Sequence, residues 1–332
     1  MVGDLSRIAY ITCLVVWPLI ASYKNYQLAE LFTMLSIREY YNTPSLFFRG
    51  LIKRCNFLFP DRLYLRLLYR IEFGKKLNLD SPESFSEKLQ WLKLYNRRSE
   101  YTTMVDKYAV KDYVARMIGE EHIIPTLGVW DNPEDIDWDS LPNQFVLKTT
   151  HGGGGTGVVI CKDKQMFDRE MAIKKLKRSM KANIYGSLRE WPYKNVSKKV
   201  IAERYMSNGD GCLNDYKVHC FNGIPRVILL CRDRFGKTGM TEDFYTDQWE
   251  HMDVKRPNHD NPNDHKRPAG LEEMLAFSRR LSEGIPFVRV DFYTIGDNVY
   301  FGELTFFPAS GLAHFEPSCY DDLFGSWLKI EA

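Results

Sequence analysis

A run of four glycines at positions 152–155 is the segment of this sequence best suited to chemistry, because it can bind an anion. No side chain crowds such a loop, so several backbone N–H groups can point at one phosphate group. Lys148, four residues earlier, would add a full positive charge. The glycines run into the β-prone Val158, Val159 and Ile160 and not into a helix, which distinguishes the loop from Walker and Rossmann loops. A flexible hairpin tip is the alternative interpretation.

Two carboxylates form a second candidate site. Asp291 and Glu303 lie in β-prone segments separated by Gly296-Asp297-Asn298, so antiparallel pairing would bring them side by side. Two adjacent carboxylates in an apolar hairpin repel each other unless a cation or a proton offsets their charge. A magnesium ion bridged to phosphates would do so. The alternative is that Arg289, which shares a strand face with Asp291, and other bases pair with them.

An acidic loop at residues 131–142 offers a third pattern. Asp137 and Asp139 have the spacing of the metal-holding DxD of nucleotide-sugar glycosyltransferases, but two prolines bracket their loop. We therefore interpret the loop as a turn and helix-cap region.

The elements that must position these residues follow from periodicity and turn signals. Helix-initiating residues at 81–85 precede a periodic run, and further helices are predicted at 106–118 and 167–181. Strands are predicted at 127–130, 145–147, 158–160 and 200–206. Residues 215–232 form a predicted hairpin with Asn222-Gly223 at its turn. Alternation along its first strand places three polar residues on one face: Asp215, Lys217 and His219.

Composition indicates an ordinary soluble enzyme. The chain has 332 residues, 44% of them hydrophobic and 27% charged, with a net charge of +2, enough for two or three subdomains. The near-neutral charge argues against general nucleic-acid binding. Seven cysteines without a CxxC pair indicate reduced thiols in the cytosol and no cysteine metal site.

The amino-terminal region differs from the rest. Residues 8–20 form an uncharged apolar run flanked by Arg7 and Lys24, shorter than the roughly 20 residues that span a bilayer. A buried or interfacial helix, a membrane anchor and a signal peptide are the three interpretations. Residues 28–79 are predicted to be helical and carry a basic, amphipathic face, which could contact anionic lipid, an acidic polymer or only solvent.

The order of these motifs resembles the ATP-grasp superfamily. In order along the chain, the motifs are Asp106-Lys107, FVLK ending at Lys148, the glycine loop, IAERYM, DYK, VRVD and GELT. Over residues 85–327, the amino-acid sequences around these motifs resemble the TupA-like branch, which is associated with teichuronopeptide and other surface-polysaccharide biosynthesis. The resemblance implies an α+β, ATP-grasp fold: two α+β subdomains that clasp ATP between antiparallel sheets, preceded by a helical amino-terminal region. The implied boundaries are 1–80 for that region and 81–332 for the ATP-grasp domain, with a glycine-loop subdomain at about 143–202 and a metal-binding subdomain at about 203–330.

The resemblance also implies a role for individual residues. Lys107 and Lys148 would contact phosphates, the glycine loop would close over the triphosphate as a mobile flap, and a hinge after residue 202 would hold adenine and ribose. The implied ATP-contacting set is Lys107, Lys148, Gly152, Gly153, Gly154, Gly155, Thr156, Gly157, Glu203, Tyr205, Met206, Asp215 and Lys217.

The implied metal ligands are Asp291 and Glu303, which would hold Mg²⁺. Most ATP-grasp enzymes carry Asn two residues after the metal-binding Glu, whereas this chain has Thr305, whose hydroxyl can still ligate the metal or a bound water. Arg289 and Lys148 are the expected catalytic residues, with Arg289 stabilising the phosphate that is transferred.

The implied reaction is ATP-dependent ligation: the γ-phosphoryl group passes to a carboxylate, and an amine attacks the acyl phosphate. The expected partners are an acidic polysaccharide or lipid-linked glycan precursor bearing uronic acid, and an amino acid or amine. Nucleic acid is not expected. The expected location is the cytoplasm, with peripheral contact of the amino terminus to the inner face of the membrane. The alternatives are a glycosyltransferase of polysaccharide biosynthesis and a non-catalytic ATP-binding protein.

Overall fold

The computed structural model describes residues 44–153, 155–208, 213–232, 240–257, 259, 262 and 265–331. The chain divides into two compact units, Met1–Leu51 and Ile52–Ala332. Only part of α4 (Pro44–Arg54) represents the first unit, so the fold described below is that of the second. The apolar run at residues 8–20 lies outside the described residues. Across the described part of the chain, no helix is both long enough and apolar enough to cross a membrane.

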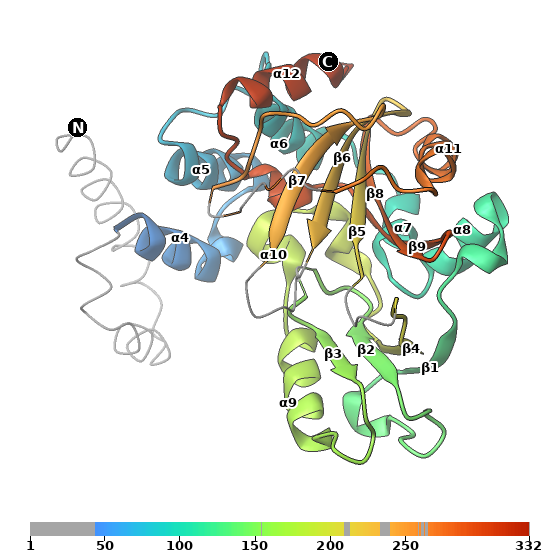
Figure 1. Cartoon of the computed structure of the whole chain (residues 1–332). Coiled ribbons are helices and arrows are strands. Elements are labelled where there is room, and N and C mark those ends of the chain that lie inside the picture. The colour runs from blue at the N-terminus through green and yellow to red at the C-terminus, as the bar shows by residue number, and fades with distance from the viewer. Residues whose placement is uncertain are drawn as a thin grey trace, which may run out of the picture. The chain divides into compact units, whose positions relative to one another are not determined.

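Two antiparallel sheets form the framework of the second unit (Figure 1). The small sheet has the order β1-β4-β2-β3, and the large sheet has the order β7-β6-β5-β8-β9. The strands of the small sheet are β1 (Thr126–Trp130), β2 (Phe145–Thr149), β3 (Val158–Cys161) and β4 (Val200–Arg204). Those of the large sheet are β5 (Asp215–Phe221), β6 (Ile224–Arg232), β7 (Thr241–Thr246), β8 (Phe287–Ile295) and β9 (Asn298–Thr305).

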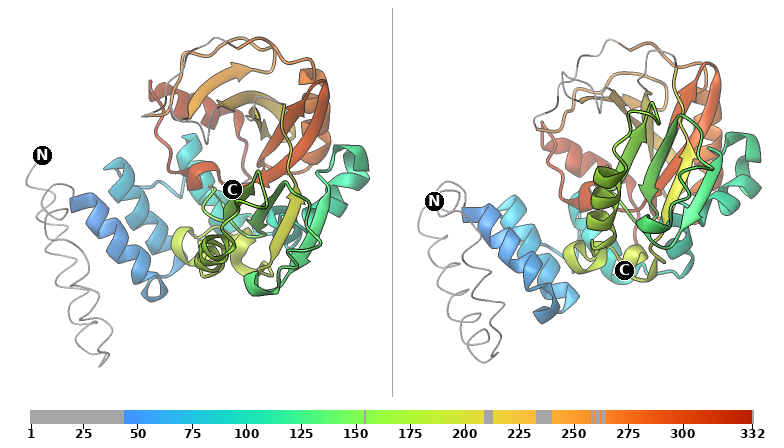
Figure 2. Two further views of the ribbon diagram at one scale, coloured as in Figure 1. Left: turned by 60° about the horizontal axis from the view of Figure 1, so that its bottom comes forward. Right: turned by 90° about the horizontal axis from the view of Figure 1, so that it is seen from below.

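Helices pack against both sheets. Helix α9 (Arg169–Met180) contacts β2 and β3 of the small sheet, and α11 (Leu271–Leu281) contacts β5, β6 and β8 of the large sheet. Both views of Figure 2 show α9 alongside the small sheet. The other α-helices in the described residues of the second unit are α5 (Asp61–Phe73), α6 (Phe85–Tyr95), α7 (Glu100–Val105), α8 (Val110–Ile118), α10 (Ile184–Leu188) and α12 (Cys319–Trp327).

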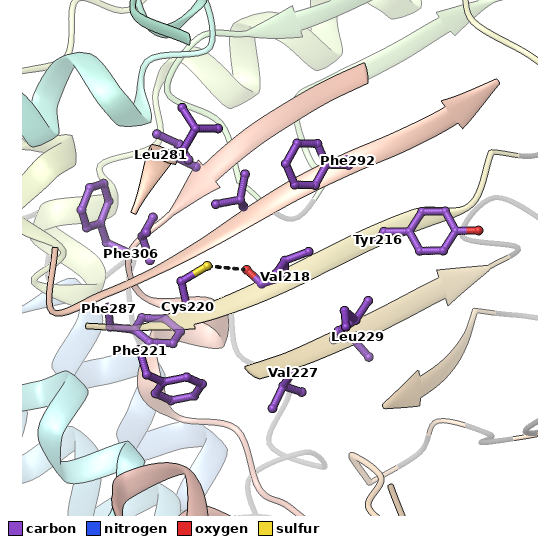
Figure 3. Packing of buried hydrophobic residues seen from close by; sticks show 14 of the residues in the cluster. Tyr216, Val218, Cys220, Phe221, Val227, Leu229, Leu281, Phe287, Phe292 and Phe306 are labelled. Carbon is purple, nitrogen blue, oxygen red and sulfur yellow. Dashed lines mark hydrogen bonds between the residues drawn. The ribbon is translucent and has the colours of Figure 1, made fainter. Parts of the chain in front are cut away.

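The largest hydrophobic cluster includes residues on both faces of the large sheet (Figure 3). Tyr216, Val218 and Cys220 alternate along β5 and are buried. Cys220 Sγ lies 3.9 Å from the carbonyl oxygen of Ser278, so this face of β5 packs against α11. The intervening residues of β5 therefore face the opposite side of the sheet, as their alternation predicts: Asp215, Lys217 and His219.

Local sequence signals account for the element boundaries. Ser84 and Glu87 form a capping box at the start of α6. Asn222 and Gly223 close the β5–β6 hairpin with φ values of 49° and 81°, the left-handed values that a type I′ turn requires. The helix predicted at 106–118 begins later, at Val110, because the Asp106 carboxylate accepts hydrogen bonds from the next backbone N–H groups and forms a turn there.

Core packing in the large sheet leads to a first prediction. Phe292 is fully buried in the main cluster, so Phe292→Ala should lower the free energy of unfolding by about 3–5 kcal/mol through lost burial and a residual cavity. Ile224, on a neighbouring hairpin of the same sheet, is 50% exposed, so Ile224→Ala is the matched control and should cost much less. Urea unfolding measures both variants. Equal losses would contradict the assignment of Phe292 to the core.

Candidate functional site

A cavity of about 260 Å³ lies between the two sheets. The small sheet contributes Lys148 from β2 and Glu203 from β4, and the large sheet contributes Lys217, Asp291 and Glu303. Segments far apart in the sequence therefore converge on one cleft. The glycine loop also lines it, because β2 and β3 form the antiparallel hairpin that the sequence predicts.

Glu203 is held by two lysines. Its carboxylate oxygens lie 2.5 Å from Lys111 Nζ and 2.6 Å from Lys148 Nζ. Burial alone would raise the pKa of Glu203, but the two ammonium groups outweigh it and lower the pKa to about 2. Conversely, burial opposes the charge on Lys148 while Glu203 favours it, and the net effect raises the pKa of Lys148. Both groups are therefore ionised at neutral pH.

Asp291 lies at the centre of a second cluster. Lys217 Nζ is 2.6 Å from Asp291 Oδ2 and 2.6 Å from Asp215 Oδ2. Arg289 binds Asp291 with two parallel bonds, Nε to Oδ1 at 2.6 Å and Nη2 to Oδ2 at 2.7 Å. Burial opposes the charge on Lys217, but Asp215 and Asp291 outweigh it and raise its pKa. The charges of this cluster stabilise one another.

Glu303 is opposite Asp291 in the β8–β9 pairing, which confirms the predicted juxtaposition of the two carboxylates. Its oxygens lie 2.5 Å from Lys107 Nζ and 3.5 Å from Arg289 Nη2. Burial would raise the pKa of Glu303, but Lys107 and Arg289 lower it well below its usual range. Thr305 donates a hydrogen bond to Glu303 at 3.3 Å and accepts one from Arg289 at 3.2 Å. The alternative in which Arg289 and other bases pair with both carboxylates therefore describes this structure.

The glycine loop is anchored at its base and uncrowded at its tip. A Cβ on Gly157 would lie 2.3 Å from Ser179 Oγ and 2.4 Å from Thr149 Oγ1, so the loop ends need glycine for close packing against α9 and β2. At Gly153 and Gly155 no atom lies within 4 Å of such a Cβ. Gly155 has φ +79°, which also favours glycine. The tip can therefore admit a ligand.

The charges of the cleft leave a small positive excess. Five basic side chains contact four carboxylates, so the formal charge of the network is +1, which favours an anionic ligand. The basic members are Lys107, Lys111, Lys148, Lys217 and Arg289, and the acidic members are Glu203, Asp215, Asp291 and Glu303.

The donor set is suitable for magnesium. Mg²⁺ prefers carboxylate, hydroxyl and phosphate oxygens and completes its octahedral shell with substrate and water. Asp291 and Glu303 are paired across β8 and β9, and the Glu303 side chain is 33% exposed in the cleft. Among the described residues, no group of three or more His, Cys, Asp or Glu side chains is arranged so that it could hold a metal ion by itself. The two carboxylates therefore fit a metal that takes its other ligands from phosphates.

Most residues named from the sequence line this cavity, although their individual roles stay predictions. Thr156 is not among the lining residues, and its hydroxyl donates to the Gly153 carbonyl within the loop. Arg289 and Thr305 bond to the lining carboxylates from outside the cavity wall, and Gly154 lies outside the described residues. Those among the residues named from the sequence that line the cavity are Lys107, Lys148, Gly152, Gly153, Gly155, Gly157, Glu203, Tyr205, Met206, Asp215, Lys217, Asp291 and Glu303.

Sequence reasoning missed Lys111 and the apolar lining. Lys111 does not line the cavity but holds Glu203 from α8, and no local pattern indicates that long-range contact. Val146 and Ile160, by contrast, could have been found, because alternation places Val146 on the strand face of Lys148 and Ile160 directly opposite Val146 on β3.

The acidic loop is a turn, as interpreted from its prolines. Asp137 Oδ1 accepts hydrogen bonds from the backbone N–H groups of Asp139 and Ser140, at 3.2 and 3.3 Å. Asp137 and Asp139 are both exposed, and neither lines the cavity. The Asp137 carboxylate therefore stabilises a turn within its own loop, and the DxD spacing does not indicate a metal site here.

The fold and cleft together define the class of protein. Two antiparallel sheets face each other across a charged cavity, with a glycine hairpin and lysine on one and paired carboxylates on the other, as the ATP-grasp resemblance implies. The family model described as TupA-like ATPgrasp matches residues 87–329. The chain belongs to this family.

Solved structures with similarity to the chain include two ligases and an ATP-grasp protein. The D-alanine–D-alanine ligase of Bacillus anthracis is 20% identical, with a TM-score of 0.37, over 61% of this chain and 57% of that one. The D-alanine–D-alanine ligase of Helicobacter pylori is 15% identical, with a TM-score of 0.41, over 75% and 68%. A RimK domain ATP-grasp protein of Sphaerobacter thermophilus is 12% identical, with a TM-score of 0.37, over 69% and 69%. The chain thus spans a little more than half of the first of these proteins, and no curated protein matches it.

The Glu203 cluster leads to a prediction about pH. Because the pKa of Glu203 falls from 4.5 to about 2 on folding, its ionised form stabilises the protein above pH 4.5, and this stabilisation is lost as the pH falls towards 2. Glu203→Gln should therefore be destabilising at pH 7, and the difference from the parent protein should shrink by ~1 kcal/mol by pH 3.5 and by on the order of 3 kcal/mol near pH 2.

Urea unfolding at pH 7, 5 and 3.5 measures this difference. Glu331→Gln is the matched control, because Glu331 is exposed near the end of the chain, and its effect should be small at every pH. A Glu203→Gln penalty that stays constant from pH 7 to 3.5 would show that the ionised carboxylate does not provide the stabilisation.

Proposed function

We propose that the protein is an ATP-dependent carboxylate–amine ligase that works through an acyl phosphate. The observation that carries this proposal is the convergence of Lys107, Lys148, Lys217 and the glycine loop with Asp291 and Glu303 on one cavity in a member of the TupA-like ATPgrasp family. Three cations and a row of backbone N–H groups suit a triphosphate, and the oxygen ligands opposite them suit its metal ion.

The nucleotide is assigned to the part of the cleft between β2, β4 and β5. Lys107 and Lys148 bind phosphates, and the uncrowded glycine tip closes over them. Glu203, with Tyr205 and Met206 after it, forms the hinge beside adenine and ribose, where the apolar Val146 and Ile160 also line the cavity. Asp215 and Lys217 face ribose and phosphates from β5.

Asp291 and Glu303 would hold Mg²⁺, with the Thr305 hydroxyl beside them, and the bound ion would neutralise charge on the phosphates. Arg289, fixed by its two bonds to Asp291, stabilises the phosphoryl group in transfer. An oxygen of the substrate carboxylate attacks the γ-phosphorus, the bond to the β,γ-bridging oxygen breaks, and ADP leaves. No protein nucleophile is required, so positioning and charge carry the catalysis.

The acid substrate is proposed to be a uronic acid of a cell-surface polysaccharide or of its lipid-linked precursor, acted on in the cytoplasm. The basic surface of α5 supports an acidic partner: Arg66 is exposed there, Arg62 is exposed and pairs with the exposed Asp80 at 2.7 Å, and Asp61 is engaged by Arg97 at 2.6 Å. Leu63, 47% exposed beside them, also suits peripheral contact with an anionic membrane.

Removing the cation at the glycine loop tests the proposed reaction. Lys148→Ala should lower turnover by roughly 100-fold or more, because a charge-assisted contact to the triphosphate is lost. Lys175→Ala is the control, since Lys175 is exposed on α9 and outside the cavity, and its turnover should match that of the parent protein. Phosphate release is measured with glucuronate or galacturonate and a panel of amino acids, and the products should be ADP and phosphate. AMP and pyrophosphate would overturn the acyl-phosphate mechanism.

The metal assignment leads to a separate prediction. Glu303→Gln keeps the size of the side chain but removes its charge, so the Mg²⁺ concentration for half-maximal nucleotide binding should rise by about 10-fold or more. Calorimetric titration of ATP at several Mg²⁺ concentrations measures this, with the exposed Glu283→Gln as control. An unchanged Mg²⁺ dependence would place the metal elsewhere.

A further inference from the structure

A second cavity, of about 30 Å³, lies beside the main cleft, and we call it the side pocket. His219 and Arg289 line it from β5 and β8, where they are directly opposite each other. They lie on the strand face that also carries Lys217 and Asp291, one strand repeat further along. The side pocket therefore continues the charged face of the large sheet past the proposed phosphoryl-transfer position.

Two arginines, Arg256 and Arg289, line the side pocket. Within the described residues, Arg289 bonds to Asp291, Glu303 and Thr305 through Nε and Nη2. Arg256 bonds to the fully buried Glu242 in the same manner, through Nε and Nη2. In each arginine Nη1, with its two N–H groups, takes no part in these bonds. This pair is therefore suited to bind a carboxylate.

His219 adds a hydrogen-bond acceptor. Its Nδ1 lies 3.0 Å from the Lys217 carbonyl oxygen, which can only accept, so Nδ1 carries the proton and Nε2 has the lone pair. Burial, with Arg289 nearby, lowers the pKa of His219 to about 3, which keeps the ring neutral. A neutral Nε2 can accept a hydrogen bond from an N–H group of a ligand.

One wall of the side pocket is strained and firmly held. Ala309 and Ser310, in the 3₁₀ segment η5 (Pro308–Gly311), have φ values of 46° and 59°, in the left-handed region. Buried Gln90 donates to the Ser310 and Gly311 carbonyls at 3.1 and 2.8 Å, and buried Lys93 donates to the Ser310 carbonyl at 2.8 Å. Strain of this kind persists only where neighbouring contacts enforce it, and it is concentrated at ligand-binding sites. The wall is therefore preorganised.

Size and apolar lining limit what the side pocket admits. About 30 Å³ has room for roughly two oxygen-sized groups, the size of a carboxylate. Phe85, Phe244 and Phe315 provide apolar walls, and the partly exposed Ala313 and Phe315 form a rim through which a ligand can enter. A sugar ring is too large for this space, whereas the carboxylate end of a small amino acid fits.

From this geometry we infer that the side pocket binds the amine co-substrate, and that this co-substrate is a small free amino acid. Arg256 and Arg289 hold its carboxylate, and His219 Nε2 accepts a hydrogen bond from its amine. The inference rests on the proposed ligase function, since it assigns the second substrate of that reaction. It also separates the two substrates, because the polymeric acid approaches through the open cleft while the side pocket selects the amine.

The ligation step balances with these groups. The uncharged amine nitrogen attacks the carbonyl carbon of the acyl phosphate, and a C–N bond forms. The C–O bond to phosphate breaks, inorganic phosphate leaves with the electron pair, and an oxygen of the departing phosphate takes up the amine proton. The hydrogen bond to His219 directs the nitrogen lone pair towards the carbonyl carbon, so His219 orients the nucleophile.

The test measures binding of the amino acid independently of turnover. The full chain, loaded with Mg²⁺ and a non-hydrolysable ATP analogue, is titrated calorimetrically with glycine, L-alanine, D-alanine, the other amino acids, methylamine, ethylamine and glucuronate. At least one small amino acid should bind, and its decarboxylated amine should bind about 10-fold or more weakly.

Ala313→Leu fills the side pocket and should weaken binding of that amino acid by about 10-fold or more. Ala269→Leu, at an exposed position, should leave its binding unchanged. His219→Leu should weaken binding, and His219→Gln, which keeps an acceptor, should restore most of it.

Several outcomes would overturn the inference: no amino acid binds, the amino acid binds Ala313→Leu as tightly as the parent protein, or glucuronate competes with it for the side pocket. Failure of the ligase function is distinguishable, because it would appear as absent binding of the ATP analogue, or as absent hydroxamate when hydroxylamine replaces the amino acid in the presence of ATP and uronate. Hydroxylamine is small enough to trap an acyl phosphate without the side pocket.

Discussion

Mutual compensation of buried charges is the constraint on which the rest of this structure depends. An ion moved from water into a protein interior costs several kcal/mol unless partners offset the loss of hydration. Glu203 and Asp291 are only 5% and 1% exposed, and each is contacted by two basic side chains. The charged residues therefore stabilise the fold as a set, and Glu203 and Asp291 both depend on at least one lysine from another segment.

Strand alternation allows the same segment to support both the core and the site. Along β5, Tyr216, Val218 and Cys220 pack into the hydrophobic cluster, while Asp215 and Lys217 on the opposite face carry charge into the cleft. Burial of the apolar face stabilises the large sheet and so fixes the position of the opposite face. A register shift of one residue would exchange the two sets, so the hydrophobic pattern specifies the site as strictly as it specifies the fold.

Local patterns explain how much of this could be predicted from the sequence. The β8–β9 hairpin placed Glu303 opposite Asp291, and alternation placed Lys217 in the cleft, because both depend only on strand period and turn position. The Lys111–Glu203 contact and the left-handed Ala309 depend on packing between distant segments, and no residue near either position signals them. The sequence also contains the residues of the side pocket, but only tertiary structure brings Arg256 to Arg289.

The network explains how a polyanion can enter a cleft whose charges are already paired. If the ligand is MgATP, its metal ion takes the place of Lys107 at Glu303, and Lys107 then becomes a partner for phosphate. Likewise Lys148 can turn from Glu203 to phosphate while Lys111 continues to hold that carboxylate. Each exchange replaces one charge-assisted contact by another, so neither a lysine nor a carboxylate is left buried without a partner. Lys111 is then needed because a single lysine could not serve the carboxylate and the nucleotide at the same time.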